Sequence, residues 1–581
     1  MLALTWRGWT DPVIDFGREL YVPWQLSEGQ VLYRDLAYHN GPFSPYLNAA
    51  WFSVAGVSLA SLLFLNFLVI VLVVCSLHRF VEDAIGRRAG VVAALSFISI
   101  FAFGQYTRFA NYNWMSPYSH EVTHGIALCL VSLWGVRAYA RTGRIAFAAL
   151  AGVALGLVFL TKAEVFIAGA AATFAGLAAA LWVRRTTSDP RKTAAIVAIT
   201  LFGGLIGPLI AFVLLGLSMP AGEALRGTLG TWVYIFDAQS VSEQFFLSNA
   251  GLEDLPGSLG LMGRSLAAWI LCLLPACVLA WLAPAKYKTW AVVGVLGLYA
   301  PAMLIVFLRR GLPTDEWLRP LPLWIGLAFV AVGSHVVRRS GPAADERGAV
   351  GSAMRVGLIT LAGVLLLKVL LAVRSGHYGF GLTMPGAALA LAWFVIGLPR
   401  WFSERGRRAP VVTCACLLLW LGSIASHLAI THEIRRLKSV RVGEGPDAFY
   451  AMPDRGALVE GARRWLENNT KPDSTLTTFI DREMLNYLTR RRNPIRFGDF
   501  NPQQLQIYGE ETMRVALVEH PPDFIALIHR DTTEYGYQYF GRDYGTGLAQ
   551  WIATHYDPVA RIGAVPFRSA RNGIAFYRRL P

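Results

Sequence analysis

Charged residues are scarce in this chain of 581 residues. Asp, Glu, Lys and Arg make up 16% of it, whereas hydrophobic residues make up 54%. Soluble globular proteins carry about 25% charged residues, so this composition excludes a single soluble globule. Intrinsic disorder is excluded as well, because aromatic residues reach 12% and long aliphatic runs supply far more apolar surface than a disordered chain carries.

Cysteine is also scarce, and its placement is uniform. All six cysteines lie inside apolar stretches, and the polar C-terminal region has none. Cys414 and Cys416 are two residues apart, which on a helix directs them to different faces. We therefore expect neither a disulfide framework nor a cysteine metal site.

The net charge of +15 is spread in a pattern typical of membrane proteins. Outside the last 140 residues, most Lys and Arg lie in short loops between apolar segments. There they set the orientation of the segments in the bilayer. We expect a membrane as partner and no nucleic acid, although basic proteins are often drawn to phosphate.

Long apolar runs dominate the first three quarters of the chain. A bilayer core of about 30 Å needs roughly 20 residues at about 1.5 Å each. Twelve candidate spans result: 58–78, 88–103, 120–140, 145–160, 164–183, 194–217, 263–283, 288–308, 318–337, 353–373, 382–400 and 410–430. The fold class predicted is a polytopic α-helical membrane protein of about 12 spans, in which Lys162 and Glu164 separate what could otherwise be one long segment from 145 to 183.

Alternate loops differ sharply in basic residues, which predicts their sidedness. The richer set is cytoplasmic by the positive-inside rule. Residues 11–45, the loop 218–262 and everything after about residue 435 then face the opposite, outer side. Only about ten residues precede Asp11, too few to span, so we expect either that the N-terminus is already outside or that a first helix is missing from this chain.

The C-terminal region has a different pattern. Helical periodicity alternates with strand-like runs, which predicts a small α/β domain. The helical stretches are 456–468, 504–519 and 545–555, and the strand-like stretches are 474–480, 523–529, 557–563 and 573–578. We divide the chain into a first outer loop with juxtamembrane helices (1–57), a multi-span domain (58–435) and an extracytoplasmic α/β domain (436–581).

The first outer loop is unusually acidic. It holds Asp15, Glu19, Glu28 and Asp35 within 21 residues. Asp15 and Glu19 are four residues apart and would share a helical face, with Arg18 close by. A like charge raises the pKa of one carboxyl and a cation keeps the other ionised, which suits a general base. The alternative interpretation is an ordinary solvated loop.

The second outer loop contains His120, Glu121 and His124, whose letters fit the His-Glu-x-x-His pattern of zinc proteases. Two imidazoles with a third ligand elsewhere would make an intramembrane protease in which Glu121 activates water. No nearby third ligand completes a known signature. Packing of the two histidines at a helix end is the other interpretation.

Two further groups of charges lie close to apolar runs, where burial is costly unless the charge is paired or solvated. Lys162 and Glu164 stand between two candidate spans, and Arg309 and Arg310 stand at an outer helix end. Lys162 and the two arginines could bind a lipid phosphate through charge-assisted hydrogen bonds. Their alternatives are an outer turn and interfacial snorkelling.

The first outer loop also resembles that of GT-C glycosyltransferases, in particular the bacterial relatives of glycosyltransferase family 39, the protein O-mannosyltransferases. Four features carry the resemblance: Asp15, Gly29, the Leu-Tyr-Arg-Asp run ending at Asp35, and the Pro-rich stretch from Gly41 to Leu47. In that family an Asp-Glu pair lies in this loop, and its Asp is taken to deprotonate the acceptor or to help bind an ion. Asp15 matches the Asp, whereas Phe16 replaces the Glu, so Glu19 is the local substitute. Glu121 matches the second acidic residue that these enzymes often carry in a later loop.

The resemblance implies an enzyme that transfers a hexosyl or pentosyl group from a polyprenyl-phosphate donor to a glycan, lipid or protein acceptor at the outer face of a bacterial inner membrane. The catalytic residues implied are Asp15, Glu19 and Glu121. Substrate would be bound by Arg18, Asp35, His120, His124, Lys162, Glu164, Arg309 and Arg310. No cofactor is certain, and a divalent metal ion stays open. A transporter of an envelope precursor is the alternative function, because embedded charges among many spans also describe a substrate path.

Overall fold

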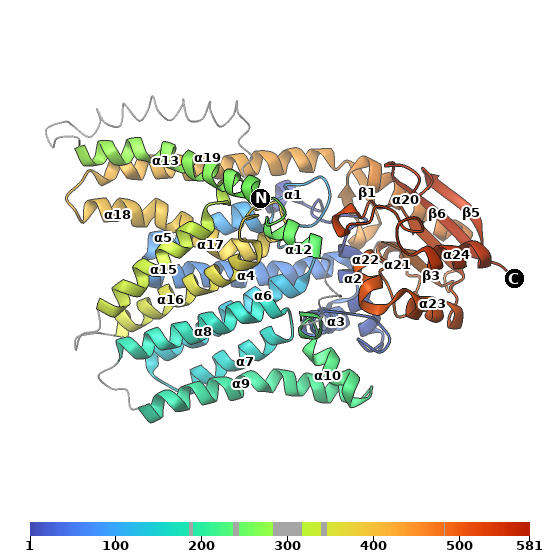
Figure 1. Cartoon of the computed structure of the whole chain (residues 1–581), viewed down its shortest axis with the longest axis horizontal. Coiled ribbons are helices and arrows are strands. Elements are labelled where there is room, and N and C mark those ends of the chain that lie inside the picture. Colours follow the sequence, from blue (N-terminus) through green and yellow to red (C-terminus); the bar gives the residue numbers. More distant parts are fainter. Residues whose placement is uncertain (185–189, 236–242, 283–315, 339–345, 481–482) are drawn as a thin grey trace.

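The computed structural model describes residues 1–184, 190–235, 243–282, 316–338, 346–480 and 483–581. Long helices lie side by side along the molecule, and a mixed domain with a small sheet covers one end of them (Figure 1). Two short helices near the N-terminus, α2 (Phe16–Ser27) and α3 (Phe43–Ala55), lie where the two parts meet.

Helices make up most of the described part of the membrane domain. Its helices are α4 (Leu59–Ala84), α5 (Arg87–Ser96) continued by η1 (Phe97–Ala102), α6 (His120–Thr142), α7 (Ala146–Phe159), α8 (Ala163–Val183), α9 (Pro190–Gly216), α13 (Leu255–Leu282), α15 (Leu321–Arg338), α16 (Glu346–Leu366), α17 (Phe380–Ala392) continued by η5 (Trp393–Gly397) and α18 (Leu398–Ser403), and α19 (Ala409–Leu437). Shorter helices at the sheet-covered end are α10 (Ala221–Leu229), α11 (Trp232–Ile235) and α12 (Glu243–Ala250).

Eight helical segments in the described residues are long and apolar enough to cross a membrane, and the apolar helices Ala146–Phe159 and Leu321–Val332 are shorter. The protein is therefore a multi-pass membrane protein. Eleven of the twelve predicted spans fall on described helices, and the span predicted at 288–308 lies outside the described residues. The apolar stretch from 145 to 183 is two helices, because Lys162 lies in the turn between α7 and α8. The total of twelve stays a prediction.

The C-terminal domain has the α/β character that the sequence predicts. Its sheet has the order β3-β4-β6-β5, in which β3 (Leu476–Phe479) pairs in parallel with β4 (Phe524–Ile528), while β6 (Gly573–Arg579) is antiparallel to both β4 and β5 (Tyr556–Gly563). Its helices are α20 (Pro453–Asn469), α21 (Met484–Thr489), α22 (Pro502–Tyr508), α23 (Glu510–Glu519) and α24 (Thr546–His555). Trp465 of α20 stacks on Phe576 of β6, which joins a helix to the sheet.

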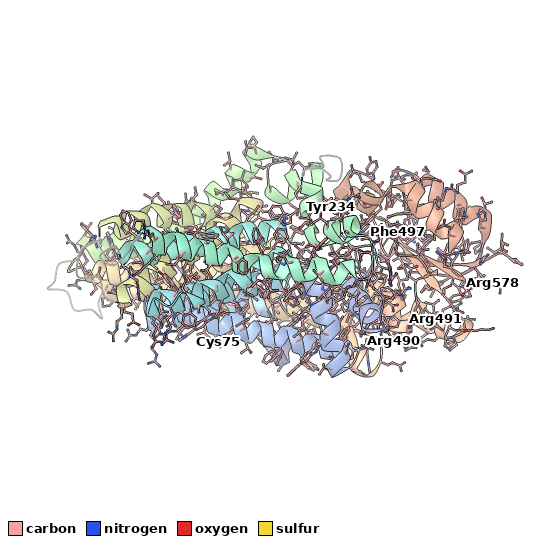
Figure 2. The ribbon with its side chains drawn as sticks, turned by 90° about the horizontal axis from the view of Figure 1, so that it is seen from below. Cys75, Tyr234, Arg490, Arg491, Phe497 and Arg578 are labelled. Atoms are coloured by element: carbon pink, nitrogen blue, oxygen red, sulfur yellow. The ribbon has the colours of Figure 1, made fainter. Side chains whose placement is uncertain are left out.

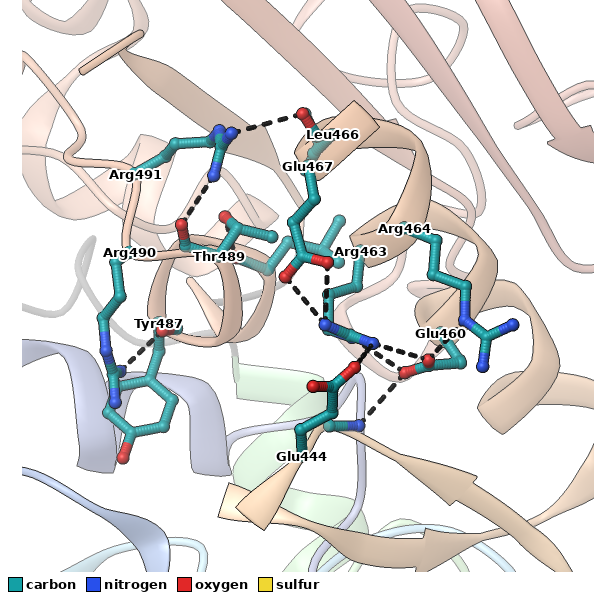
Figure 3. A network of polar contacts seen from close by, with 12 residues as sticks. Glu444, Glu460, Arg463, Arg464, Leu466, Glu467, Tyr487, Thr489, Arg490 and Arg491 are labelled. Atoms are coloured by element: carbon teal, nitrogen blue, oxygen red, sulfur yellow. Dashed lines mark hydrogen bonds and ion pairs between the residues drawn. The ribbon is translucent and has the colours of Figure 1, made fainter. Parts of the chain in front are cut away.

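A network around Arg463 joins α20 to the hairpin of β1 (Val440–Val442) and β2 (Phe449–Ala451) (Figure 3). Its guanidinium contacts Glu460 and Glu444, each at 2.8 Å, and Glu467 at 2.7 Å. Burial favours the neutral form of Glu460, but hydrogen bonds from Arg463 and Arg464 outweigh it and lower the pKa of Glu460 to about 2. Glu460 therefore keeps its charge through the mildly acidic range.

The C-terminal domain packs directly onto the first loop. The backbone N–H of Asn493 donates to the Tyr21 hydroxyl (2.8 Å), and the N–H of Ala37 donates to the carbonyl of Arg496 (2.8 Å). Figure 2 shows Arg490 and Arg491 at this junction, whereas Cys75 lies in the membrane domain. The first loop and the C-terminal domain consequently lie at the same end of the helices.

The carboxylate of Asp447 makes three polar contacts at this junction. Its Oδ1 accepts hydrogen bonds from the Leu59 N–H and the Tyr487 hydroxyl, both at 2.7 Å, and its Oδ2 pairs with Arg490 at 2.8 Å. It thus holds the first turn of α4 against the C-terminal domain.

Replacing Asp447 by Ala should destabilise the protein by about 1–3 kcal/mol, because donors buried at the junction would lose their acceptor. The change is measured as a lower Tm of the purified protein. Asp557→Ala, on exposed strand β5, is the control and should leave the Tm unchanged. Equal Tm values for the two variants would contradict the role given to Asp447.

Candidate functional site

A cavity of about 530 Å³ lies between the covered ends of the membrane helices and the C-terminal domain. Six segments of the membrane part contribute to it: the start of α2 with the turn before it, the loops that precede α3, α6 and α17, the turn between α7 and α8, and α12. Their polar lining residues are Asp15, Arg18, His39, Asn40, Tyr112, Tyr118, Ser119, Lys162, Asn249 and Tyr378. The C-terminal domain contributes Arg455, Gln503, His529, Arg530, Asp531, Thr533, Glu534, Tyr535 and Asn572.

Asp15 lies at the wall of this cavity, immediately before α2. Its backbone is in the left-handed region (φ 64°), which non-glycine residues adopt rarely and mostly at constrained sites. Asp11 fixes the turn, since its Oδ1 accepts from the N–H groups of Val13 (2.9 Å) and Ile14 (2.8 Å). Asp11 is in turn held by the side chain of Asn111, which accepts from its N–H at 2.8 Å. The local fold therefore presents Asp15 at a set position.

Glu19 lies one turn further along α2 and is buried in an ion-pair network. Its Oε1 contacts Arg18 at 2.5 Å, and its Oε2 accepts from His120 Nδ1 at 2.5 Å. Burial alone would raise the pKa of Glu19, but the charge of Arg18 and the hydrogen bond from His120 hold it well below its usual range. Glu19 is thus an ionised anchor, and it orients Arg18, which lines the cavity.

Glu121 is fully buried and outside the cavity lining. It accepts hydrogen bonds from the Tyr38 hydroxyl and from Ser119 Oγ. Burial and the charge of Glu121 hold the pKa of Tyr38 well above its usual range, so this phenol stays a donor. The guanidinium of Arg18 also stacks 5.3 Å from the Tyr38 ring. Glu121 and Glu19 therefore both support the residues around Arg18.

His120 and His124 do not offer the ligand set of a zinc protease. Nδ1 of His120 is bound to Glu19, and its Nε2 contacts the Asn66 amide at 3.0 Å. The buried ring of His124 packs 5.1 Å from that of His120 and 6.5 Å from Phe43. No group of three His, Cys, Asp or Glu within the described ranges is arranged to hold a metal ion.

Lys162 is a buried cation on the membrane side of the cavity. It is 7% exposed, and its Nζ lies 5.4 Å from the centre of the Tyr118 ring and 5.9 Å from that of Tyr378. Burial raises the pKa of Tyr378, but the ammonium groups of Lys162 and Lys368 outweigh it and lower that pKa. In the part of the chain that the structure describes, Lys162 has no carboxylate at ion-pair distance.

Glu164 forms its ion pair with Lys368 and not with Lys162. The Lys368 ammonium is in addition 5.6 Å from the Tyr378 ring. Glu164 therefore neutralises one of the two lysines of this cluster and leaves Lys162 as the cation that faces the cavity.

The remaining predicted residues lie elsewhere. Asp35 forms a surface pair with Arg34 (2.8 Å) and accepts from the Val31 N–H, outside the cavity lining. Arg309 and Arg310 lie outside the described residues. Sequence reasoning missed Arg455 and His529, which reach the cavity only through packing of the C-terminal domain.

Replacing Glu19 by Gln should cost about 3–5 kcal/mol of stability at neutral pH, because Arg18 would lose its buried counter-charge. The depressed pKa of Glu19 stabilises the fold above the pKa of the unfolded chain, near 4.3, and this contribution is lost as the pH falls below it. The difference in Tm between wild type and Glu19→Gln should therefore shrink below about pH 4. A difference that stays constant from pH 7 to pH 3 would contradict this account.

Comparison with known proteins agrees with the resemblance in the first loop. Residues 39–206 match the family model described as dolichyl-phosphate-mannose-protein mannosyltransferase. This segment is less than a third of the chain and includes His120, Glu121 and Lys162, whereas Asp15 and the C-terminal domain lie outside it. The family is of the GT-C type, so the superfamily that the sequence indicated is confirmed. No curated protein matches the chain.

Two solved structures match over nearly the whole of this chain. One is the oligosaccharyltransferase AglB of Archaeoglobus fulgidus in complex with an inhibitory peptide and a dolichol-phosphate, with a TM-score of 0.46, 13% identity and coverage of 99% of this chain and 71% of that one. The other is ArnT of Cupriavidus metallidurans bound to undecaprenyl phosphate, with a TM-score of 0.45, 12% identity and coverage of 99% and 96%.

Proposed function

We propose that this protein is an integral-membrane glycosyltransferase that moves a hexosyl or pentosyl group from a polyprenyl-phosphate donor to an envelope acceptor. The observation that carries the proposal is one cavity at the end of the membrane helices that holds a carboxylate, Asp15, and a buried ammonium, Lys162. The family match over residues 39–206, which contains Lys162, supports it.

Lys162 would bind the donor phosphate. The prenyl chain stays among apolar helices, so its phosphate lies at their ends, at the level of the turn that carries Lys162. When the sugar leaves, negative charge grows on the phosphate, and a positioned ammonium in a water-poor site stabilises that charge. Tyr118 and Tyr378 hold the lysine side chain in place.

Asp15 would act as the general base. An acceptor hydroxyl attacks the anomeric carbon, its proton passes to the Asp15 carboxylate, and the bond from that carbon to the phosphate oxygen breaks with the electron pair going to the phosphate. Direct displacement inverts the anomeric carbon. Glu19 and Glu121 act as positioning residues, since both are buried and hydrogen-bonded beside Arg18.

The reaction would occur at the outer face of a bacterial inner membrane. The loops on the face opposite the C-terminal domain are the richer ones in Lys and Arg, and the positive-inside rule assigns such loops to the cytoplasm. The C-terminal domain and the cavity then face the extracytoplasmic side, where polyprenyl-phosphate sugars are presented.

The test is an assay of the purified full chain in lipid nanodiscs with radiolabelled polyprenyl-phosphate hexoses and pentoses. We expect release of the sugar from at least one lipid donor, and none from the matching nucleotide sugars. A well-folded preparation that consumes no lipid donor, and that carries labelled lipid-linked sugar across vesicles instead, would establish the transporter alternative.

A further inference from the structure

The wall that the C-terminal domain contributes to the cavity contains two hydrogen-bond donors that the reaction above does not use. Arg455 lies in the first turn of α20, and His529 directly follows β4. Both line the cavity.

Arg455 forms a long ion pair with Asp11, and its side chain makes no hydrogen bond within the described part of the chain. Its guanidinium packs 5.0 Å from the Phe109 ring, and its side chain is 21% exposed. Nη1 is buried and lies 3.7 Å from Asp11 Oδ1, too far for a hydrogen bond, and that oxygen already accepts from Val13 and Ile14. A buried donor without an acceptor is costly, so the position favours a ligand that brings one.

His529 supplies a second donor nearby. Its Nδ1 accepts a hydrogen bond from the Phe567 N–H at 3.0 Å, so the neutral ring carries its proton on Nε2. The His529 N–H donates to the carbonyl of Gly573 at 2.9 Å, which fixes the backbone. Among the described residues no acceptor engages Nε2, and the ring lines the cavity.

The carboxylates on the same wall are engaged already. Glu534 pairs with Arg530 at 2.6 Å, and Asp531 accepts from the N–H and the hydroxyl of Thr533. Of the two arginines on this wall, Arg530 is held by Glu534 at 2.6 Å, whereas Arg455 meets a carboxylate, that of Asp11, only at 3.7 Å.

We propose that Arg455 and His529 form an anion subsite that binds a phosphate or carboxylate group of the acceptor. An arginine fork matches both groups in geometry. The subsite rests on the proposed function for its meaning, since it would hold the acceptor while a hydroxyl of that molecule reaches Asp15. It is separate from the donor phosphate, which lies with Lys162 on the membrane side.

The test measures binding of two small probes to the full chain in nanodiscs, glycerol 1-phosphate and glycerate, with glycerol as the neutral control. Calorimetric titration is run on wild type, Arg455→Gln, His529→Gln, Lys162→Gln and Arg561→Gln. Arg561 is an exposed arginine of β5 outside the cavity and is the matched control. Comparing the two anions shows whether the subsite prefers phosphate or carboxylate.

We expect wild type to bind at least one anion more tightly than glycerol, and Arg455→Gln to weaken that binding at least tenfold. His529→Gln should weaken it less, and Arg561→Gln should keep it. No preference for anions over glycerol in wild type, or affinity kept within twofold in Arg455→Gln, would overturn the subsite, as would loss of all anion binding in Lys162→Gln.

Arg455→Lys is the control for a folding defect, because it keeps the positive charge. It should bind the anion more tightly than Arg455→Gln does, and the two variants should have the same Tm. Donor turnover without acceptor is measured on the same preparations. Anion binding that depends on Arg455 in a protein that consumes no donor would disprove the proposed function and leave the subsite standing. Donor turnover in a protein that binds no anion would disprove the subsite and leave the proposed function standing.

Discussion

Asp15→Asn should lower the rate of sugar transfer by about 100- to 10,000-fold while donor binding stays close to wild type. The amide has nearly the shape of the carboxylate but cannot accept the proton of the acceptor hydroxyl. The side chain of Asp11 fixes the turn that carries Asp15. The neighbouring structure should therefore tolerate the replacement of Asp15 by Asn. Single-turnover assays with a radiolabelled lipid donor give the transfer rate, and filter binding gives the donor affinity.

Glu28→Gln is the matched control for this variant. Glu28 directly follows helix α2 as its C-cap residue. It pairs with Arg492 at 3.0 Å on the surface, where such pairs contribute little to stability. Its transfer rate should equal that of wild type. If Asp15→Asn transferred sugar at a rate within threefold of wild type, another group would have to be the base.

Lys162→Gln should reduce kcat by about 100- to 1,000-fold, the loss typical of removing one group that stabilises a developing negative charge. In contrast to Asp15→Asn, it should also weaken donor binding, because the ground-state phosphate is already anionic. Lys162→Arg should retain part of both, since it keeps the charge. The measurement is kcat and KM for the lipid donor, together with donor affinity.

Lys192→Gln removes an exposed lysine in the first turn of α9 and should change neither parameter. Unchanged donor affinity in Lys162→Gln would mean that the phosphate is bound elsewhere. Lys368, which pairs with Glu164, would then be the alternative cation for the phosphate at this end of the helices.

The spans and the C-terminal domain were predictable because both depend on local periodicity. Runs of about 20 apolar residues specify membrane helices, and alternating patterns of α and β type specify the small domain. The helices α20 and α24 and the strands β3 to β6 fall within a few residues of the predicted stretches. These features need no knowledge of distant contacts.

The site was predictable only in part. Asp15, Arg18 and Lys162 were recognised as charges beside apolar segments, and they line the cavity. The pairing of Glu19 with His120 joins helix α2 to the first residue of α6, and periodicity does not indicate which buried polar groups pair across such distances in the chain. In the sequence, Arg455 is one of several arginines in a helical stretch. Its place in the cavity wall depends on how the C-terminal domain packs over the first loop, which the sequence pattern does not indicate.

That packing also determines the order in which parts of the site can form during synthesis and folding. The C-terminal domain is synthesised after the membrane helices, yet Asp447 and Asn493 complete the hydrogen bonds of Leu59 and Tyr21, which are made early. Contacts so distant along the chain form late in folding. The cavity can be completed only after the C-terminal domain has docked, so a chain still under synthesis has Asp15 and Lys162 but lacks the wall that contains Arg455 and His529.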